Sequence, residues 1–374
     1  MTHLSSRILD LAIDIQQIPA PTFHEQQRAA FVHKLFAEEN LSDVSMDAAG
    51  NVYARLPASR PSSVGSPSGK GPRPIIVSAH LDTVFPANTD LKVVREPGRV
   101  AGPGIGDNSV GLAGLFGILW SLRERRIELS SDLWLVANVC EEGLGDLLGM
   151  KAVVERFGSE PAAYIVLEGM SLGSIYHRAL GVRRYRITVR TEGGHSWIDY
   201  GKPSAVHELT RLAALITTLK LPQAPRTTLN VGRIEGGTSV NTIAAEAALE
   251  LDLRSEDWNV LEKISAQVED LVHAVDRVGV EINAQVIGQR PAGEIPGDHP
   301  LVRLAEACLQ EVGFNPHRNI GSTDANQPLS RGFPAVTIGL TTGAGAHTVH
   351  EYINIDPLQK GLEQAVRLVS GIQG

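Results

Sequence analysis

Histidine and carboxylate residues follow directly after apolar stretches at several places in the chain. His80 ends the stretch "PIIVSAH", and Asp82 lies two residues further on. Glu141 and Glu142 follow "DLWLVANVC", and Glu168 ends "AAYIVLE". Imidazole nitrogens and carboxylate oxygens are ligands of Zn²⁺ in proteins. A metal-bound imidazole usually donates its other N–H to a carboxylate, and Asp82 is placed to accept from His80.

Two loops add further groups of the same kind. Asp107 lies in "GPGIGDNSVG", ahead of an apolar helix, and a Gly-rich loop after "PAVTIGL" leads to His347 and His350. If all these side chains meet, they form a set of buried like charges, which is very costly unless cations compensate them. Two imidazoles and three or more carboxylates suit two Zn²⁺ ions that share a carboxylate, roughly 3.5–4 Å apart.

Each residue also has an ordinary structural role available. His80 alone could be a hydrogen-bonded structural histidine, and Glu141 and Glu142 could form a solvated loop pair. Glu168 could cap a helix or lie on the surface, and Asp107 could cap the helix that follows it. The metal hypothesis therefore depends on the joint pattern and not on any one member.

Apolar strands that alternate with helices are expected to bring these groups together. Such a pattern predicts an open α/β sheet covered on both faces, and ligands bind beyond the carboxyl ends of strands in such sheets. The strands are expected at 74–80, 132–140, 162–169 and 334–340. Helices are expected at 4–18, 110–126, 147–158 and 299–312, together with one that ends at about 39 and a last one that begins at 357.

Residues 180–290 follow a different pattern. Tyr185, Ile187 and Val189 alternate with arginine and threonine, as in a half-exposed strand. Further strands are expected at 227–237, 247–257 and 280–289, with helices from Ser204 and over 259–276. The order β-α-β-β-α-β is ferredoxin-like. We therefore expect a catalytic domain in two parts, 1–179 and 291–374, interrupted by a small α+β domain at 180–290.

Composition narrows the class of protein. The 374 residues carry a formal charge of −8, and no basic stripe offers a nucleic-acid surface. Two cysteines cannot form a disulfide framework, which fits a reducing compartment. The sequence shows neither a long uncharged apolar run nor a secretory signal, so we expect a cytoplasmic enzyme that is not bound to a membrane. The segment 57–74, rich in Ser, Pro and Gly, is expected to be a mobile surface loop.

Six motifs occur in the order seen in one family of co-catalytic zinc hydrolases: "HLDTVF", "GPGIGDNSVG", "CEEGLGD", "TEGGHS", "EGGTSVNTIA" and "AHTVHEY". The family includes peptidase T, glutamate carboxypeptidase, acetylornithine deacetylase and succinyl-diaminopimelate desuccinylase. The resemblance covers essentially the whole chain. It implies a zinc-exopeptidase-like α/β catalytic domain, with a mixed central sheet flanked by helices. It also implies that the inserted ferredoxin-like domain is a lid and dimerisation domain, so that the protein is a homodimer.

The resemblance also implies roles for single residues. Asp82 orients His80, Glu141 is the general base, and the peptide bond between Asp107 and Asn108 is cis. His347 matches a metal-binding histidine better than its neighbour His350. The metal ligands that the family pattern implies are His80, Asp107, Glu142, Glu168 and His347. Zn²⁺ is the expected ion at both positions, with Co²⁺ or Mn²⁺ as alternatives.

Substrate contacts are implied in the same way. His195 matches a residue that reaches the partner subunit's active site and stabilises the oxyanion, although a turn histidine is the ordinary alternative. Arg254 could hold a substrate carboxylate or form an exposed salt bridge. The other positions that match substrate-binding residues are Asn241, Thr323 and Asp324. Asp107 matches the family's aspartate that bridges both ions. The family usually has Asp-Lys or Met-Lys after this aspartate, whereas this chain has Asn108-Ser109.

The reaction implied is amide hydrolysis by a metal-bridging water, with Glu141 taking its proton and passing it to the leaving amine. We expect cleavage of small peptides, and deacylation of N-acyl amino acids is the alternative. A binding protein with structural cations would leave Glu141 without a role beside Glu142. A phosphate- or nucleotide-binding function for the loop "GPGIGDNSVG" is not favoured, because the loop lacks the Lys-Ser/Thr of a P-loop.

Overall fold

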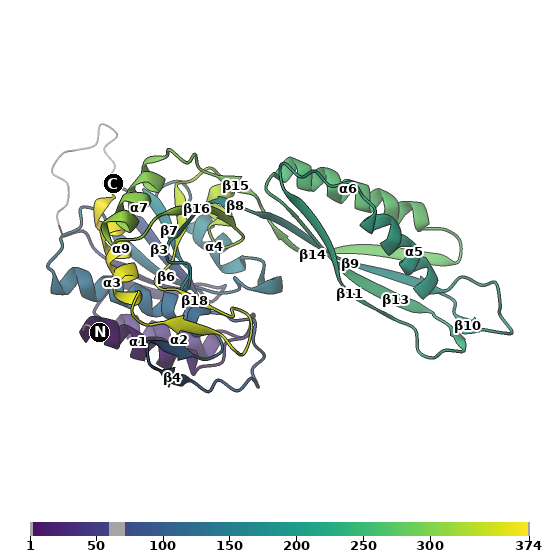
Figure 1. The fold of residues 1–374 in the computed structure, drawn as a ribbon, viewed down its shortest axis with the longest axis horizontal. Coiled ribbons are helices and arrows are strands. Elements are labelled where there is room, and N and C mark those ends of the chain that lie inside the picture. Colours follow the sequence, from purple (N-terminus) through teal and green to yellow (C-terminus); the bar gives the residue numbers. More distant parts are fainter. Residues whose placement is uncertain (1–2, 60–71, 373–374) are drawn as a thin grey trace. The chain divides into compact units, whose positions relative to one another are not determined.

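The computed structural model of the protein describes residues 3–59 and 72–372. The chain forms two compact units, one of Met1–Ala179 with Glu294–Gly374 and one of Leu180–Gly293, and each is described separately below. Figure 1 shows the elements of both units. Most of the segment predicted to be a mobile surface loop, residues 60–71, lies outside the described residues.

A mixed sheet forms the centre of the first unit. Within the described residues its strand order is β1-β2-β6-β3-β7-β17-β8-β15, with β16 beside β8. β3, β6, β7 and β17 run parallel to one another. β2 pairs with β1 and β6 in the antiparallel direction, and β8 pairs antiparallel with β17 and parallel with β16. The strands are β1 Ser42–Met46, β2 Val52–Leu56, β3 Ile75–His80, β6 Leu133–Asn138, β7 Ala163–Leu167, β8 Ser174–Ala179, β15 Gly293–Glu294, β16 His317–Gly321 and β17 Ala335–Ile338.

Helices flank this sheet, as the alternating pattern predicted (Figure 1). They are α1 His3–Gln16, α2 Gln26–Glu38, α3 Val110–Glu124, α4 Leu148–Phe157, α7 Pro300–Glu311, α8 Asn326–Ser330 and α9 Leu358–Gly371. Among the described residues, one stretch, Ile105–Glu124, is long and apolar enough to cross a membrane, but 94% of its apolar window is buried in the unit. We read it as a core helix, because α3 packs against α1, α9 and the sheet.

The parallel strands place the predicted residues at one edge of the sheet. β3 ends at His80, β6 ends just before Glu141 and Glu142, and β7 ends just before Glu168. Since β3 lies between β6 and β7, these three carboxyl ends are neighbours. A second small sheet has the order β18-β19-β5-β4. Its strands are β4 Val94–Glu96, β5 Arg99–Ala101, β18 Gly343–Ala344 and β19 Tyr352–Asn354. His347 lies in the loop between β18 and β19, and β19 contacts the segment Ile105–Ser109, which contains Asp107.

The second unit has the predicted β-α-β-β-α-β order. Its antiparallel sheet has the order β11-β13-β9-β14, and α5 and α6 pack against it and against each other. Tyr185, Ile187 and Val189 are buried in its core, as their alternation predicted. The main elements are β9 Gly181–Thr191, α5 Ala205–Thr217, β11 Thr227–Gly236, β13 Glu246–Ser255, α6 Trp258–Val275 and β14 Val280–Arg290, and the short strands β10 Gly194–His195 and β12 Thr242–Ile243 pair separately.

Candidate active site

Asp107 lies between His80 and His347, which are far apart in the sequence. Its Oδ1 is 3.0 Å from Nε2 of His80, and its Oδ2 is 3.1 Å from Nε2 of His347. The carboxylate thus turns one oxygen toward each imidazole, which is the arrangement that a bridging ligand requires. The Asp107–Asn108 peptide bond is cis, as the resemblance predicted. Ser109 precedes α3 as its N-cap, so Asp107 does not cap that helix.

Two groups of three ligands share Asp107. One is His80, Asp107 and Glu168, and the other is Asp107, Glu142 and His347. In each group one ligand atom from every residue lies within 4.8 Å of the others. Glu142 Oε1 is 3.2 Å from Nε2 of His347, and Glu168 Oε2 is 3.9 Å from Nε2 of His80. The five residues predicted as metal ligands therefore lie together.

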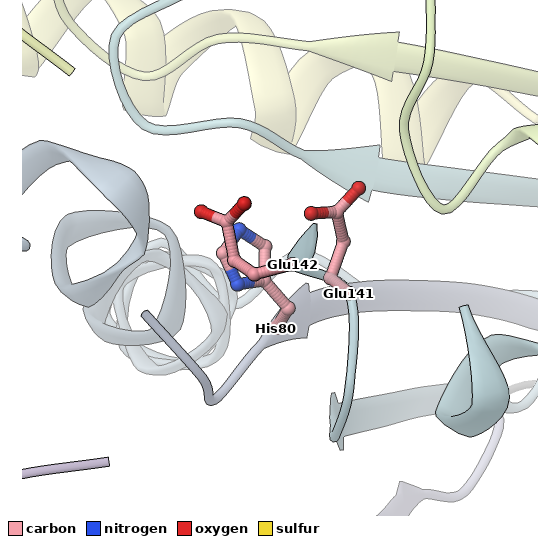
Figure 2. Close-up of side chains that lie close together, drawn as sticks. All are labelled: His80, Glu141 and Glu142. Carbon is pink, nitrogen blue, oxygen red and sulfur yellow. The ribbon is translucent and has the colours of Figure 1, made fainter. Parts of the chain in front are cut away.

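Glu141 and Glu142 lie over the end of the strand that carries His80. Figure 2 shows both carboxylates on the same side of that strand end as the imidazole, and His80, Glu141 and Glu142 form a further group within 4.8 Å. Each glutamate is only 5% exposed, so the alternative of a solvated loop pair is wrong.

Asp82 connects the ends of β3 and β6. Its Oδ1 accepts a hydrogen bond from the amide of Glu141 and its Oδ2 from the amide of Glu142, each at 2.9 Å. The nearest acceptor for His80 Nδ1 is the Asp82 backbone carbonyl at 3.0 Å, whereas the carboxylate Oδ1 is 3.5 Å away. Because a carbonyl can only accept, Nδ1 carries the hydrogen and Nε2 faces Asp107. Asp82 therefore orients His80 mainly through its backbone and the glutamate loop through its carboxylate.

The electrostatics of the cluster fit divalent cations. Burial raises the pKa of Glu168 well above its usual range, and the charges of Asp107, Glu141 and Asp324 raise it further, although His80 opposes the shift. Hydrogen bonds from His347 and His80 outweigh burial and hold the pKa of Asp107 well below its usual range. The imidazoles thus offset only part of the negative charge, and cations held by the same nitrogen and oxygen atoms would offset more of it.

Close backbone packing brings Glu168 beside Asp107. A Cβ atom on Gly169 would lie 2.1 Å from the carbonyl oxygen of Gly106, so only glycine permits this approach. Asn108 is fully buried; its Nδ2 donates to the carbonyl of Leu167 at 2.7 Å, and its Oδ1 accepts from the amide of Gly169 at 3.1 Å. Asn108, where the chain departs from the family pattern, therefore holds the backbone on both sides of Glu168.

Glu351 is a site residue that the sequence reasoning missed. It is fully buried, and its carboxylate accepts hydrogen bonds from the amides of Gly104 at 3.1 Å, Gly106 at 2.6 Å and Asp107 at 2.8 Å. Burial raises the pKa of Glu351 to about 7. Glu351 therefore ties the loop of His347 to the loop of Asp107. Its position four residues after His347 was the available signal.

Glu25 and Arg28 were also missed. Glu25 Oε1 accepts hydrogen bonds from the amide of Cys140, at 3.1 Å, and from its thiol. Arg28 is 1% exposed and donates to the carbonyls of Ile18 and Leu81. Burial lowers the pKa of Arg28 to about 10, although the charges of Asp82 and Glu25 oppose that shift. Neither residue belongs to a recognisable motif. Glu25 directly precedes α2 and Arg28 lies in it, and the sequence of this helix looks like that of a surface helix.

The second unit carries His195 and Asn241 on neighbouring short strands or loops. β10 pairs with β12, and the amide of Ser196 donates to the carbonyl of Asn241 at 3.0 Å. The amides of Trp197 and Ile198 donate to Nδ1 of His195 at 3.2 and 3.4 Å. Since Nδ1 accepts these bonds, the hydrogen of the neutral ring is on Nε2.

The remaining predicted substrate residues have partners of their own. Arg254 Nε donates to Oδ1 of Asp252 at 2.7 Å, which is the salt bridge weighed as its alternative role. Thr323 Oγ1 is 2.9 Å from Oγ1 of Thr337. Asp324 has no exposed surface, and its Oδ2 accepts from Nδ2 of Asn138 at 2.7 Å. Their contacts with a substrate stay predictions.

Known proteins resemble the chain over nearly its whole length. A succinyl-diaminopimelate desuccinylase of Corynebacterium glutamicum is 25% identical over 367 residues, which cover 95% of this chain and 92% of that protein. The aminopeptidase PepT of Bacillus cereus superposes with a TM-score of 0.78 at 23% identity, covering 98% of both chains. The YXEP protein of Bacillus subtilis, a dinuclear metal-binding peptidase, superposes with a TM-score of 0.69 at 15% identity, covering 99% of this chain and 98% of that one.

The solved structures confirm the predicted fold, a catalytic α/β domain with an inserted domain. The desuccinylase relative and a match to a family model confirm the enzyme class of metallohydrolase. The model of the peptidase family M20/M25/M40 matches residues 76–371. The chain therefore belongs to peptidase family M20/M25/M40.

Proposed function

We propose that the protein is a two-metal hydrolase that cleaves an amide bond of small peptides as an exopeptidase. The single observation that carries this proposal is the pair of ligand groups that share Asp107. Deacylation of N-acyl amino acids is the second candidate, because the desuccinylase relative hydrolyses an N-acyl amide by its name. The aminopeptidase neighbour favours peptides, by its name alone.

His80, Asp107 and Glu168 would hold one ion, and Asp107, Glu142 and His347 the other. Such ions, Zn²⁺ being the expected one, polarise a carbonyl oxygen and lower the pKa of water when bound. The nitrogen and oxygen donors of the cluster suit Zn²⁺, and they also suit Co²⁺ or Mn²⁺. The dinuclear metal-binding peptidase among the neighbours supports two ions in one site.

Glu141 serves as the proton carrier in this proposal. It lies beside Glu142 and His80 at the strand end, and Asp82 fixes its backbone through a hydrogen bond of 2.9 Å. A carboxylate in this place can take a proton from the attacking water, hold it, and deliver it to the leaving amine. Glu142 already faces His347 as a ligand, so the two adjacent glutamates have separate roles.

His195 would stabilise the oxyanion that forms when the carbonyl is attacked. Its Nε2–H is available as a donor, because Nδ1 accepts from two backbone amides. Removing one such donor costs about 2.7–4 kcal/mol in other hydrolases.

The proposal includes a homodimer through residues 180–290, in which His195 serves the partner's site. Asn241 and Arg254 would contact the substrate, as would Thr323 and Asp324. A cytoplasmic location is also part of it, and the two cysteines, both free and buried, are compatible with that location.

The test is a panel of dipeptides, tripeptides and N-acetyl amino acids, assayed with protein loaded with Zn²⁺. We expect peptide cleavage, and E141Q should lose about 10²–10⁴-fold in turnover while its metal content and fold are unchanged. The matched control is E155Q, which changes an exposed glutamate on α4 and should behave as wild type. Cleavage of acylated amino acids alone would select the second candidate, and full activity of E141Q would remove Glu141 from its role.

A further inference from the structure

Three loops of the first unit that adjoin the predicted active site each carry an exposed apolar side chain. Phe23 is 52% exposed, Val84 38% and Leu144 53%. Phe23 follows Thr22, whose hydroxyl donates to the Asp82 carboxylate at 2.9 Å. Val84 lies two residues after Asp82, and Leu144 lies two residues after Glu142. We name these three residues, Phe23, Val84 and Leu144, the apolar rim.

The three loops that carry the apolar rim contact one another. The amide of Thr83 donates to the carbonyl of Ala20 at 2.9 Å, so the loop of Val84 lies along the loop of Phe23. A Cβ atom on Gly145 would be 2.6 Å from Cγ2 of Thr22, so the loop of Leu144 packs against the same segment. The rim is therefore built from three adjacent loops that converge on the Asp82 carboxylate.

The rim contrasts with the group that it adjoins. The cluster of His80, Glu141 and Glu142 consists of polar and charged side chains, all buried. Large apolar side chains gain free energy when they leave water, so an exposed set next to a catalytic centre favours a ligand that covers it with apolar atoms. A charged or polar substrate side chain would instead lose hydration there.

The second unit, taken by itself, repeats this pattern around its own predicted residues. Trp197 is 86% exposed and Ile198 77% exposed, and they lie two and three residues after His195 in the chain. Val240, which precedes Asn241, is fully exposed. Each of the two compact units thus has exposed apolar residues within three positions in sequence of residues expected to act at the site.

We infer that the apolar rim selects substrates with a large apolar side chain, such as leucine or phenylalanine, next to the amide that is cleaved. This inference rests on the proposed function, because it assigns a substrate class to the same site. Phe23, Val84 and Leu144 determine specificity and take no part in the chemical step.

The test compares probes that are matched except for their leucine or serine side chains: Leu-Leu against Ser-Ser, and N-acetyl-leucine against N-acetyl-serine. For wild type the readout is the ratio of kcat/KM within each pair, and for E141Q it is the ratio of Kd by calorimetry, which needs no turnover. We expect the leucine probe to be favoured about tenfold or more in a pair that the site accepts, the usual scale for apolar pockets. F23A and L144A should each reduce that preference severalfold. The control is L215A, which removes an exposed leucine from α5 and should leave the ratio unchanged.

Equal binding of the leucine and serine probes would overturn the inference. A leucine preference that F23A and L144A both leave intact would also overturn it. So would rim variants that change only the sedimentation of the protein, because the rim would then be a contact between protein molecules. The proposed function fails in a different way: wild type would cleave no probe of either kind. If E141Q and wild type then still bound leucine probes preferentially and L144A abolished that preference, the apolar rim would stand without the hydrolase.

Discussion

Asp82→Asn should release the backbone of at least one of the two glutamates, Glu141 and Glu142. Asp82 is fully buried, and its two oxygens separately accept the amides of Glu141 and Glu142, each at 2.9 Å. Asparagine has one acceptor oxygen, so its NH₂ group must face one of these two N–H donors. The variant therefore loses at least one hydrogen bond to a charged group, worth about 1.5–3 kcal/mol.

Amide hydrogen exchange measured by mass spectrometry reports this loss locally. At 1.36 kcal/mol for each factor of ten, the exchange of the peptide that contains residues 138–146 should become about 10- to 150-fold faster. The measurement is made on metal-free protein, so that metal binding does not add to the protection. Turnover of the loaded enzyme should also fall, because Glu141 is no longer held in place.

Thr22→Val is the matched control for this variant. It removes the hydroxyl that donates to Oδ2 of Asp82 at 2.9 Å and leaves both glutamate amides bonded. Exchange in residues 138–146 should then stay close to wild type. If D82N exchanged as slowly as wild type there, the Asp82 carboxylate would not be what orders the glutamate loop, and the reasoning would be refuted.

Two further predictions concern the histidines. Hydrogen bonds with Asp107 and Glu142 raise the pKa of His347 from 6.5 to about 10, so their stabilisation of the metal-free protein is complete below pH 6.5 and is lost as the pH rises toward 10. Metal binding at pH 7 must then release a proton, and its heat should differ between buffers of different ionisation enthalpy; no difference would contradict a protonated His347. Mixing H195A with D107N subunits should restore part of the activity if each site is completed by the partner, and no rescue would argue against sharing.

The buried parallel strands and the β-α-β-β-α-β order of the second unit could be predicted because each gave a regular signal in the sequence, whereas the proposed ligand set came from the family resemblance. Buried strands such as Ile75–His80 are mostly apolar, and the histidine and carboxylate residues that end or follow them are conspicuous. The short strands His317–Gly321 and Ser174–Ala179 were missed, since their mixed side chains give no clear period.

Residues that support the site were harder to predict than residues that would bind metal. Glu25 and Arg28 look like surface residues, and their burial depends on contacts with Cys140 and Leu81, far away in sequence. The role of Asp82 was only partly predicted, because sequence spacing cannot distinguish its backbone carbonyl from its carboxylate as the partner of His80. Long-range hydrogen bonds of this kind leave no periodic trace in the chain.

Residues around the start of α2 contribute more to the predicted site than the family match suggests. That match begins at residue 76, yet Thr22 bonds Asp82, Glu25 bonds Cys140, and Arg28 bonds the carbonyl of Leu81, between His80 and Asp82. A shortened protein that started at residue 76 would retain all five proposed ligands. It would lose the hydrogen bonds that Thr22, Glu25 and Arg28 make to the loops after β3 and β6. We therefore expect that exchanging this N-terminal segment between relatives would change how the loops after β3 and β6 are held, while all five proposed ligands stay the same.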